Sequence, residues 1–386
     1  MRPAKRVVVY SVIIVLVVSS VFADSYLPTP AYPHEESIYF NTLGIPALQK
    51  LGLNGAGVKV AIIDSGINSA LPVFNTGQVI AWRDYVNGEP TPYDDDGHGT
   101  AVASIIAANP ASLPFSGGGT ISDFTGVAPG VSLIMAKVIN SNNVVSNCSV
   151  IANAIHWVME YNPAIINISI EGCPYASNGL SVVDQAIDWA YGQGALVVVI
   201  AGNFGNESGS ISVPGDAIDG LTVGAVNVYG TGILNYSDAG PTADGRIKPD
   251  LVAPSGIKVA ENSGMMAVSN DGMLYDNWWG TSFSAPLVVG IAALLKQWDP
   301  HLTAANITAI LEETAHHLGT PGQNDLYGYG LVNATAAFTK VAGVSPQTVA
   351  LSRSLHDAEF GLMVGVLLAV AVEVVVWLRG PRHGRR

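Results

Sequence analysis

Charged side chains are scarce in this chain: 12% of its 386 residues are Asp, Glu, Lys or Arg, whereas 49% are hydrophobic. This balance excludes an intrinsically disordered protein, because disordered chains are charged and poor in apolar residues. Between residues 24 and 378 the chain holds ten of its 17 basic residues. Outside the final apolar run, the same part holds 29 of the 30 acidic residues, so its formal charge is near −19. Such an acidic surface would repel nucleic acid, so we expect no nucleic-acid partner.

Cysteine is nearly absent, since Cys148 and Cys173 are the only two. A chain of this length can bury a core without disulfide staples. In an exported protein the two could form one disulfide, or each could be a small buried apolar residue. The sequence leaves both readings open because it supplies no distance between them. The histidines have no Cys, His or Glu partners at zinc-binding spacing.

Apolar runs that suit export or a membrane span occur at the two ends. Residues 1–23 combine a basic start, an apolar run and small residues up to Ala23, which is the pattern of an export signal. Cleavage after Ala23 and retention as an uncleaved anchor are both compatible with it. Residues 360–378 are all apolar or Gly except Glu373, and a helix of this length nearly spans a bilayer. The basic tail 379–386 follows, which predicts a cytoplasmic C-terminus and an extracellular main domain.

These features predict a single-pass protein of the cell membrane with one large outer domain. About 330 residues between the two ends suit one α/β domain better than two small ones. The expected segments are a signal peptide at 1–23, a lead-in at 24–42, the main domain at 43–341, a stalk at 342–359, a transmembrane helix at 360–378 and a cytoplasmic tail at 379–386.

Between the ends, short apolar runs alternate with helical patterns, which predicts a mainly parallel sheet with helices on both faces. The Gly- and Ser-rich stretch 109–123 is expected to be a surface loop. The expected strands are Lys59–Asp64, Leu133–Val138, Ala164–Ile170, Ala195–Ala201, Leu221–Val226 and Asp250–Ala253. The expected helices are His98–Ala108, Val150–Tyr161, Val182–Tyr191, Thr281–Trp298 and Ala304–Thr314.

Three short segments carry residues suited to nucleophilic catalysis. Asp64 ends a buried strand before a Gly turn, His98 lies between two glycines at a helix start, and Ser282 begins a long apolar helix. Each has an ordinary structural reading when taken alone, as a turn or cap residue. Together they combine a carboxylate, a base and a hydroxyl, which are the groups that activate a serine nucleophile.

In this order, the three segments resemble the signatures of the subtilisin-like serine proteases, the subtilase family. The similarity runs from about residue 43 to 338 and includes Gly126-Val-Ala-Pro129, Ile166-Asn-Ile-Ser169, Ala201-Gly-Asn203, Gly240-Pro-Thr-Ala-Asp-Gly-Arg-Ile-Lys-Pro-Asp250 and Gly328-Tyr-Gly-Leu-Val-Asn333. The resemblance implies a three-layer subtilisin-like fold and a serine endopeptidase acting on proteins or peptides.

The resemblance also implies a role for each matched residue. Ser282 would be the nucleophile, His98 the general base, and Asp64 the carboxylate that orients the imidazole. Asn203 would donate its side-chain amide to the oxyanion of the tetrahedral intermediate. The expected substrate contacts are Ser169, Ile170, Glu171, Gly172, Gly202 and Thr281.

One expected contact departs from the family, because Glu171 stands where Gly is usual. It suggests a mild preference for basic or polar substrate side chains, and a solvated loop carboxylate is the alternative reading. Calcium is common in the family, and three consecutive acids, Asp94 to Asp96, are a candidate cluster. They also suit the start of a helix, so no metal ligand is assigned. Two other functions stay open: a selective processing protease or transpeptidase, and an inactive protease-like binding protein.

Overall fold

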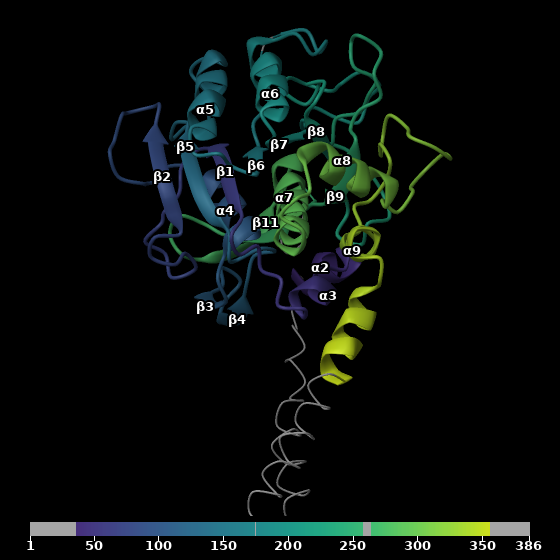
Figure 1. The fold of residues 1–386 in the computed structure, drawn as a ribbon. Helices are drawn as coiled ribbons and strands as arrows, with labels where there is room; N and C mark the ends of the chain where they lie inside the picture. The colour runs from purple at the N-terminus through teal and green to yellow at the C-terminus, as the bar shows by residue number, and fades with distance from the viewer. Residues whose placement is uncertain (1–35, 174, 258–263, 356–386) are drawn as a thin grey trace, which may run out of the picture. The chain divides into compact units, whose positions relative to one another are not determined.

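The computed structural model describes residues 36–173, 175–257 and 264–355 (Figure 1). One compact unit spans residues 34–346 and contains all the elements named below. A second unit joins residues 1–33 to 347–386, and of these only 347–355 are described; they are helical. The expected signal peptide and transmembrane helix lie outside the described residues. Within the described ranges, the helices are too short or too polar to cross a membrane.

A seven-stranded sheet forms the centre of the larger unit, in the order β2-β5-β1-β6-β7-β8-β9. Each neighbouring pair is parallel. The inner strands are apolar and buried along nearly their whole length because helices cover both faces. The strands are β1 Lys59–Asp64, β2 Val79–Asp84, β5 Ser132–Lys137, β6 Ile165–Ile168, β7 Leu196–Ile200, β8 Leu221–Val226 and β9 Leu251–Pro254.

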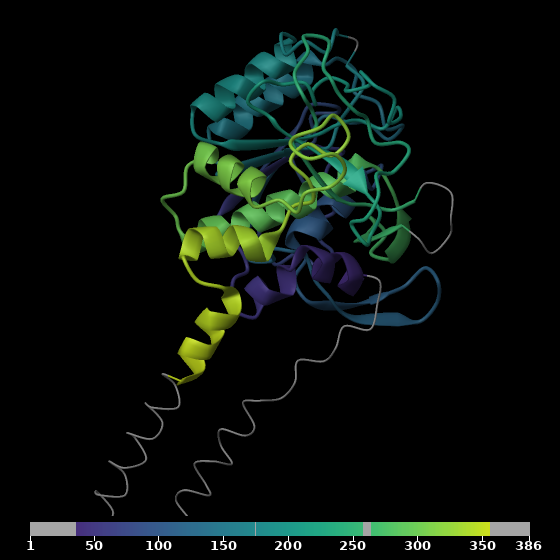
Figure 2. The same cartoon turned by 90° about the vertical axis from the view of Figure 1, so that its right-hand side faces the viewer.

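Helices form a layer on each side of this sheet. Helices α5 and α6 pack together on one face, and α4 and α7 pack together on the other (Figures 1 and 2). The expected three-layer α/β fold with a mainly parallel central sheet is therefore confirmed. The helices are α2 Glu36–Leu43, α3 Ile45–Gln49, α4 His98–Ala107, α5 Ser149–Met159, α6 Val182–Gly192, α7 Thr281–Trp298, α8 Ala304–Glu313 and α9 Ala334–Ala342.

The expected strands and helices agree with the structure to within two residues at each end. The sequence patterns missed the edge strand β2, in which Ala81 is buried and the other side chains are half-buried or exposed. They also missed α2, which contributes buried Tyr39 and Leu43 to the compact unit. Both elements are short and partly polar, so their apolar patterns are weak.

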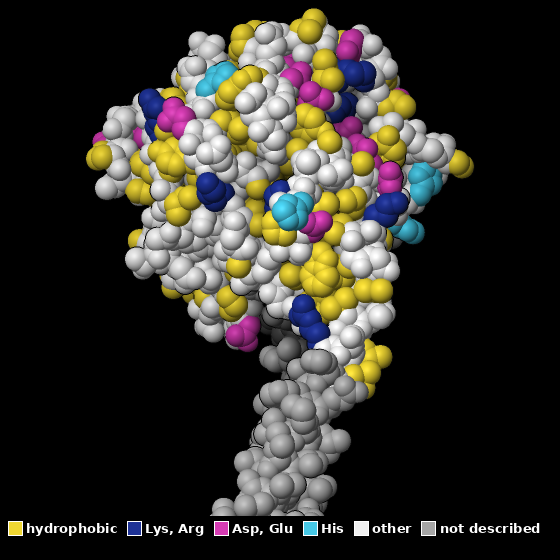
Figure 3. All heavy atoms as spheres, viewed as in Figure 1, with side chains coloured by type: hydrophobic (Ala, Val, Ile, Leu, Met, Phe, Trp, Pro, Cys, Tyr) yellow, Lys and Arg dark blue, Asp and Glu magenta, His cyan; other side chains and the backbone are white. Residues whose placement is uncertain are grey.

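The stretch 109–123 is not the surface loop that its composition suggested. It forms most of an antiparallel hairpin, β3 Ala111–Pro114 with β4 Thr120–Phe124. The Gly and Ser residues are concentrated in the connecting turn, while Leu113 and Phe124 are buried. A second antiparallel pair joins β10 Met265–Val268 to β11 Leu274–Trp278. On the face seen in Figure 3, acidic and basic side chains are interspersed among uncharged ones.

Candidate active site

Asp64 and His98 meet at the carboxyl edge of the sheet. Asp64 is the last residue of β1 and is fully buried, and His98 is the first residue of α4. His98 Nδ1 lies 2.7 Å from Asp64 Oδ1, which also accepts a 2.7 Å hydrogen bond from Ser65 N. Because a carboxylate only accepts, this contact places the imidazole proton on Nδ1 and leaves Nε2 as an acceptor.

Opposing influences act on the pKa of His98. Burial disfavours the imidazolium, but the charge and hydrogen bond of Asp64 favour it, and Asp96 and Asp94 add to that attraction. The net effect raises the pKa of His98 above its usual value. About 14% of the His98 side chain remains exposed. The ring is therefore a base of increased strength that stays accessible.

A tight backbone contact sets the position of His98. A Cβ on Gly99 would lie 2.2 Å from the Gly66 carbonyl oxygen, so only glycine allows α4 to approach the turn after β1 so closely. Asp94 stabilises this helix start by accepting hydrogen bonds from Gly97 N (2.8 Å) and Thr100 N (2.9 Å). Position 99, next to His98, therefore requires a residue without a Cβ atom.

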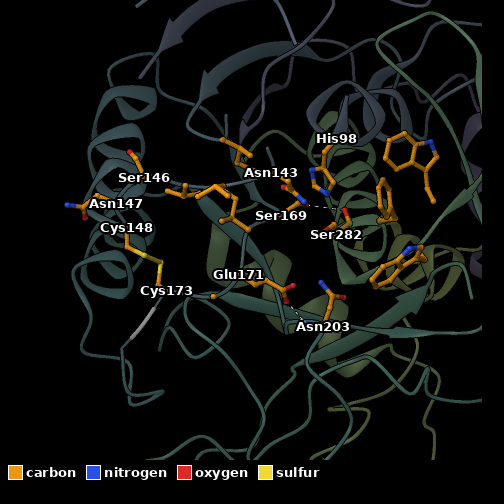
Figure 4. Close-up of a pocket in the computed structure, with 18 of the residues that line it drawn as sticks. His98, Asn143, Ser146, Asn147, Cys148, Ser169, Glu171, Cys173, Asn203 and Ser282 are labelled. Carbon is orange, nitrogen blue, oxygen red and sulfur yellow. Dashed lines mark hydrogen bonds between the residues drawn. A yellow bond between two sulfur atoms is a disulfide. The ribbon is translucent and has the colours of Figure 1, made fainter. Parts of the chain in front are cut away.

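Ser282 reaches the same site from another element, as the second residue of α7. Its backbone carbonyl accepts a 3.1 Å hydrogen bond from Ser169 Oγ, which joins the helix start to the segment after β6. Phe283, the next residue, packs edge-on against the His98 ring at 5.4 Å between centroids. In Figure 4 the Ser282 side chain and the His98 ring lie beside each other. The fold therefore brings together three residues that are 34 to 218 positions apart in sequence.

Asn203 follows β7 and faces Ser282 from a third element. Its Oδ1 accepts hydrogen bonds from Thr281 N (2.8 Å) and Thr281 Oγ1 (3.1 Å). Since the carbonyl oxygen is held in this way, the amide nitrogen points toward the space next to Ser282 (Figure 4). Asn203 is thus oriented as a hydrogen-bond donor to a group bound there.

A cavity of about 1020 Å³ extends from these residues along two chain segments. One wall is formed by residues 143–148, and the other by residues 169–173. Trp278 and Trp279 also line it, and Trp278 packs against Phe283, the neighbour of Ser282, at 5.2 Å between ring centroids. The cavity is large enough to accept part of an extended peptide whose backbone lies between the two walls.

A disulfide connects the two walls of this cavity. Cys148 and Cys173 are bonded, with Cα atoms 5.8 Å apart, and both line the cavity. Cys148 precedes α5, whereas Cys173 lies in the loop after β6 (Figure 4). Of the two readings that the sequence left open, the structure has the disulfide.

Most of the expected substrate contacts line the cavity. Ser169 to Gly172 form part of its wall, but Gly202 and Thr281 lie behind the lining residues, where Thr281 Oγ1 donates to Gly202 O at 3.3 Å. The carboxylate of Glu171 is not solely a solvated group, because Oε2 accepts a hydrogen bond from Asn203 N. Glu171 therefore contacts the turn that carries Asn203.

The three consecutive acids point to different partners. Asp94 binds backbone N–H groups at the start of α4, Asp95 pairs with Lys137 Nζ at 2.6 Å, and Asp96 accepts from His98 N at 3.1 Å. No group of three or more His, Cys, Asp or Glu side chains suited to a metal ion occurs in the described part of the chain.

Two buried ionisable residues near the site, Lys137 and Asp238, were not predicted from the sequence. Lys137 is fully buried and donates to Ser65 O (2.5 Å), Ile139 O (2.8 Å) and Asp95. Asp238 is fully buried behind Asn203. A charged residue within an apolar stretch was a signal for Lys137, but Asp238 lies in a polar stretch that gave none.

The chain is similar in sequence to several bacterial proteases. A model of the Subtilase family matches residues 55–330. Subtilisin Savinase from Lederbergia lenta is 36% identical over 292 residues, which are 76% of this chain and 94% of that protein. Serine protease AprX from Bacillus subtilis is 32% identical over 304 residues, 73% of this chain and 66% of AprX.

Solved structures give the same result for the fold. The CspB protease of Clostridium perfringens superposes with a TM-score of 0.67 at 19% identity, over 81% of this chain and 98% of that one. A cold adapted subtilisin-like serine proteinase superposes with a TM-score of 0.57 at 25% identity, over 73% and 91% of the two chains.

Proposed function

This chain belongs to the subtilase family, and from that membership we propose that it is an active serine endopeptidase with Ser282 as nucleophile. The observation that carries the proposal is the contact between His98 Nδ1 and Asp64 Oδ1, 2.7 Å long, beside Ser282 in one cavity. A serine hydroxyl is a weak nucleophile without such an adjacent base.

Proton transfer through His98 would drive both halves of the reaction. As Ser282 Oγ attacks the peptide carbonyl carbon, its proton passes to His98 Nε2. Asp64 accepts the Nδ1–H hydrogen bond and stabilises the imidazolium that forms. His98 then gives the proton to the leaving amine, which frees the first product and leaves an ester on Ser282. Water, deprotonated by His98, then attacks the ester carbonyl. The bond to Ser282 Oγ breaks, and His98 returns the proton to Ser282 as the acid product leaves.

Negative charge on the substrate oxygen would be stabilised by two donors. The amide of Asn203 is held by its contacts with Thr281, so it needs little reorganisation. The backbone N–H of Ser282, at the start of α7, is the second donor and is favoured by the helix dipole.

Substrate would bind as an extended strand between the cavity walls 143–148 and 169–173. Glu171 adds negative charge to one wall. We expect a mild preference for basic or polar side chains at P1 and P4. Peptides with Lys, Leu or Glu at these positions test this, and equal rates with the Glu peptides would contradict it.

Two other functions use the same site differently. A selective processing protease or transpeptidase would label with a fluorophosphonate at Ser282 but would leave casein intact. An inactive binding protein would not label. The disulfide across the cavity favours the selective enzyme over a broad one, since it limits how far the walls can separate.

We also propose that the protein is tethered to the cell membrane with its catalytic domain outside. The support is in the sequence: the export pattern of residues 1–23, the apolar run 360–378 and the basic tail 379–386. In this arrangement residues 342–359 would be the stalk. Of the expected lead-in 24–42, residues 36–42 belong to α2 in the compact unit.

Cleavage of a peptide library by the full-length protein tests the proposed activity. Wild type should cleave peptides and label with a fluorophosphonate, and Ser282→Ala should do neither. Retained cleavage by Ser282→Ala would show that another residue is the nucleophile.

A further inference from the structure

The turn that carries Asn203 is held by two side-chain carboxyl groups. Asn203 N donates to Glu171 Oε2. The next two N–H groups, those of Phe204 and Gly205, both donate to Asp238 Oδ1, at 2.7 and 2.9 Å. Three successive backbone N–H groups therefore donate hydrogen bonds to carboxyl oxygens from two separate loops. The position of the turn, and with it the Asn203 side chain, depends on both groups.

Asp238 lies directly behind this turn and is not among the residues that line the cavity. Its N–H donates to Gly202 O at 3.0 Å. A Cβ on Gly202 would lie 2.0 Å from Asp238 Oδ2, so the carboxyl group packs against the glycine backbone. Within the described ranges Oδ2 has no hydrogen-bond partner, although the Ser212 hydroxyl is its polar neighbour. A buried, unpaired carboxyl oxygen is costly when charged but much less so when protonated.

The surroundings of Asp238 favour its neutral form. Burial is the largest influence, and the negative charge of Glu171 adds to it, while the N–H groups of Gly205 and Phe204 and the Ser212 hydroxyl act in the opposite direction. Together they raise the pKa of Asp238 to about 7. The group would therefore change its charge near neutral pH, next to the backbone of the proposed oxyanion donor.

We propose that Asp238, together with Glu171, is a positioning residue of the oxyanion turn: its Oδ1 holds the turn that carries Asn203, and its negative charge, when it ionises, opposes the developing oxyanion. The inference rests on the proposed function, because it concerns the same intermediate. A negative charge close to the turn weakens the stabilisation of a second negative charge on the substrate oxygen. Substrate binding should change little, because Asp238 does not line the cavity.

Asp238→Asn is the main test, because asparagine keeps an acceptor for the two N–H groups but cannot ionise. In wild type, kcat should rise with pH as His98 loses its proton and fall again as Asp238 loses its own. In Asp238→Asn the fall on the alkaline side should disappear, while KM stays within about twofold. An alkaline fall that persists unchanged in this variant would overturn the proposal.

Asp238→Ala tests positioning separately from charge. It removes the acceptor of two amides, so kcat should fall about 10- to 100-fold at the pH where wild type is most active, again with little change in KM. The alkaline fall should also disappear, because alanine cannot ionise. Rescue by Asp238→Asn distinguishes this effect from a general loss of packing. A kcat of Asp238→Ala equal to that of wild type would contradict the positioning role.

Glu171→Gln tests the coupling between the two carboxyl groups. It preserves an oxygen acceptor for Asn203 N but removes the charge that helps to raise the pKa of Asp238. The alkaline fall in kcat should therefore move to lower pH. An unchanged midpoint would exclude Glu171 from the pair.

Asp216→Asn is a matched control. Asp216 is also fully buried, and within the described part of the chain its Oδ1 has no hydrogen-bond partner. Burial raises its pKa, and like Asp238 it does not line the cavity, but it accepts from Gly179 N and not from the turn of Asn203. Its pH profile should match that of wild type. All measurements use the full-length protein. If wild type neither cleaves peptides nor labels, the proposed function fails; if it does both and Asp238→Asn matches it at every pH, only this inference fails.

Discussion

His98 is the residue at which burial and charge compete most directly. The aspartates around it outweigh burial and raise its pKa. In the proposed mechanism, only the neutral imidazole can accept the Ser282 proton. The pKa of this one residue would then set the acid limit of the pH range in which the enzyme works.

The acid side of the pH profile should therefore lie above the usual histidine range. Because the folded-state pKa is raised, activity is absent well below it and appears as the pH rises through it. We expect the midpoint of kcat/KM above 6.5, the unperturbed value. A midpoint below that value, measured with an uncharged peptide, would contradict this assignment of the base.

Asp64→Asn should lower kcat by roughly 10⁴-fold, the size of the loss in related triads, because the imidazole would no longer be held in the required tautomer. It also removes the charge that most favours the imidazolium, so the remaining acid midpoint should move to lower pH. The measurement is kcat against pH for both proteins. A loss of less than tenfold would show that Asp64 does not orient His98.

At the scale of elements, loops at one edge of the sheet support the site. The disulfide between the start of α5 and the loop after β6 connects the cavity walls. Lys137, at the end of β5, connects the turn after β1 to Asp95. Both links lie away from the reacting atoms, so their loss should act on stability first.

The double variant Cys148→Ser/Cys173→Ser should lower the free energy of unfolding by roughly 3–4 kcal/mol, because a cross-link over 25 residues restricts the unfolded chain. Denaturant unfolding of wild type with and without reductant is the matched comparison. A midpoint that neither reduction nor the substitution changes would show that the bond adds nothing to stability.

Lys137→Met should lower the free energy of unfolding by about 2 kcal/mol or more, since it leaves the carbonyl groups of Ser65 and Ile139 unpaired in the interior. Lys340→Met is the control: its ion pair with Glu313 is 3.2 Å long and exposed, so the change should be within about 0.5 kcal/mol. Equal effects of the two substitutions would argue against a structural role for the buried ammonium.

At the scale of the whole molecule, the proposed export signal and membrane span at the two ends of the chain would decide where the catalytic domain works. Full-length protein should sediment with membranes and resist alkaline extraction, because residues 360–378 would cross the bilayer. A chain ending at residue 354 should be released in soluble form. Recovery of the full-length protein in the soluble fraction would overturn the proposed tether. Protection of the basic tail 379–386 from added protease would show on which side of the membrane the tail lies.

Local sequence patterns were enough to predict the inner strands, the long helices and the family of this protein. Unbroken apolar runs predicted the inner parallel strands, since strands covered on both faces have no polar side. The segments around Asp64, His98 and Ser282 identified the family, and the glycines beside His98 marked a close backbone approach. Weak patterns failed at the edge strand β2 and at the hairpin of β3 and β4, where polar residues and glycines resemble a loop.

Only the tertiary structure decided how loops that are distant in sequence combine. It joined Cys148 to Cys173, and it placed the carboxyl groups of Asp238 and Glu171 against the turn that carries Asn203. The physical reason is that parallel strands end at a common edge, so the loops after β6 and β7 and the segment between β8 and β9 meet there. No single segment encodes the packing in this region. That packing decides which carboxyl groups accept hydrogen bonds from the turn of Asn203 and how burial changes their pKa values.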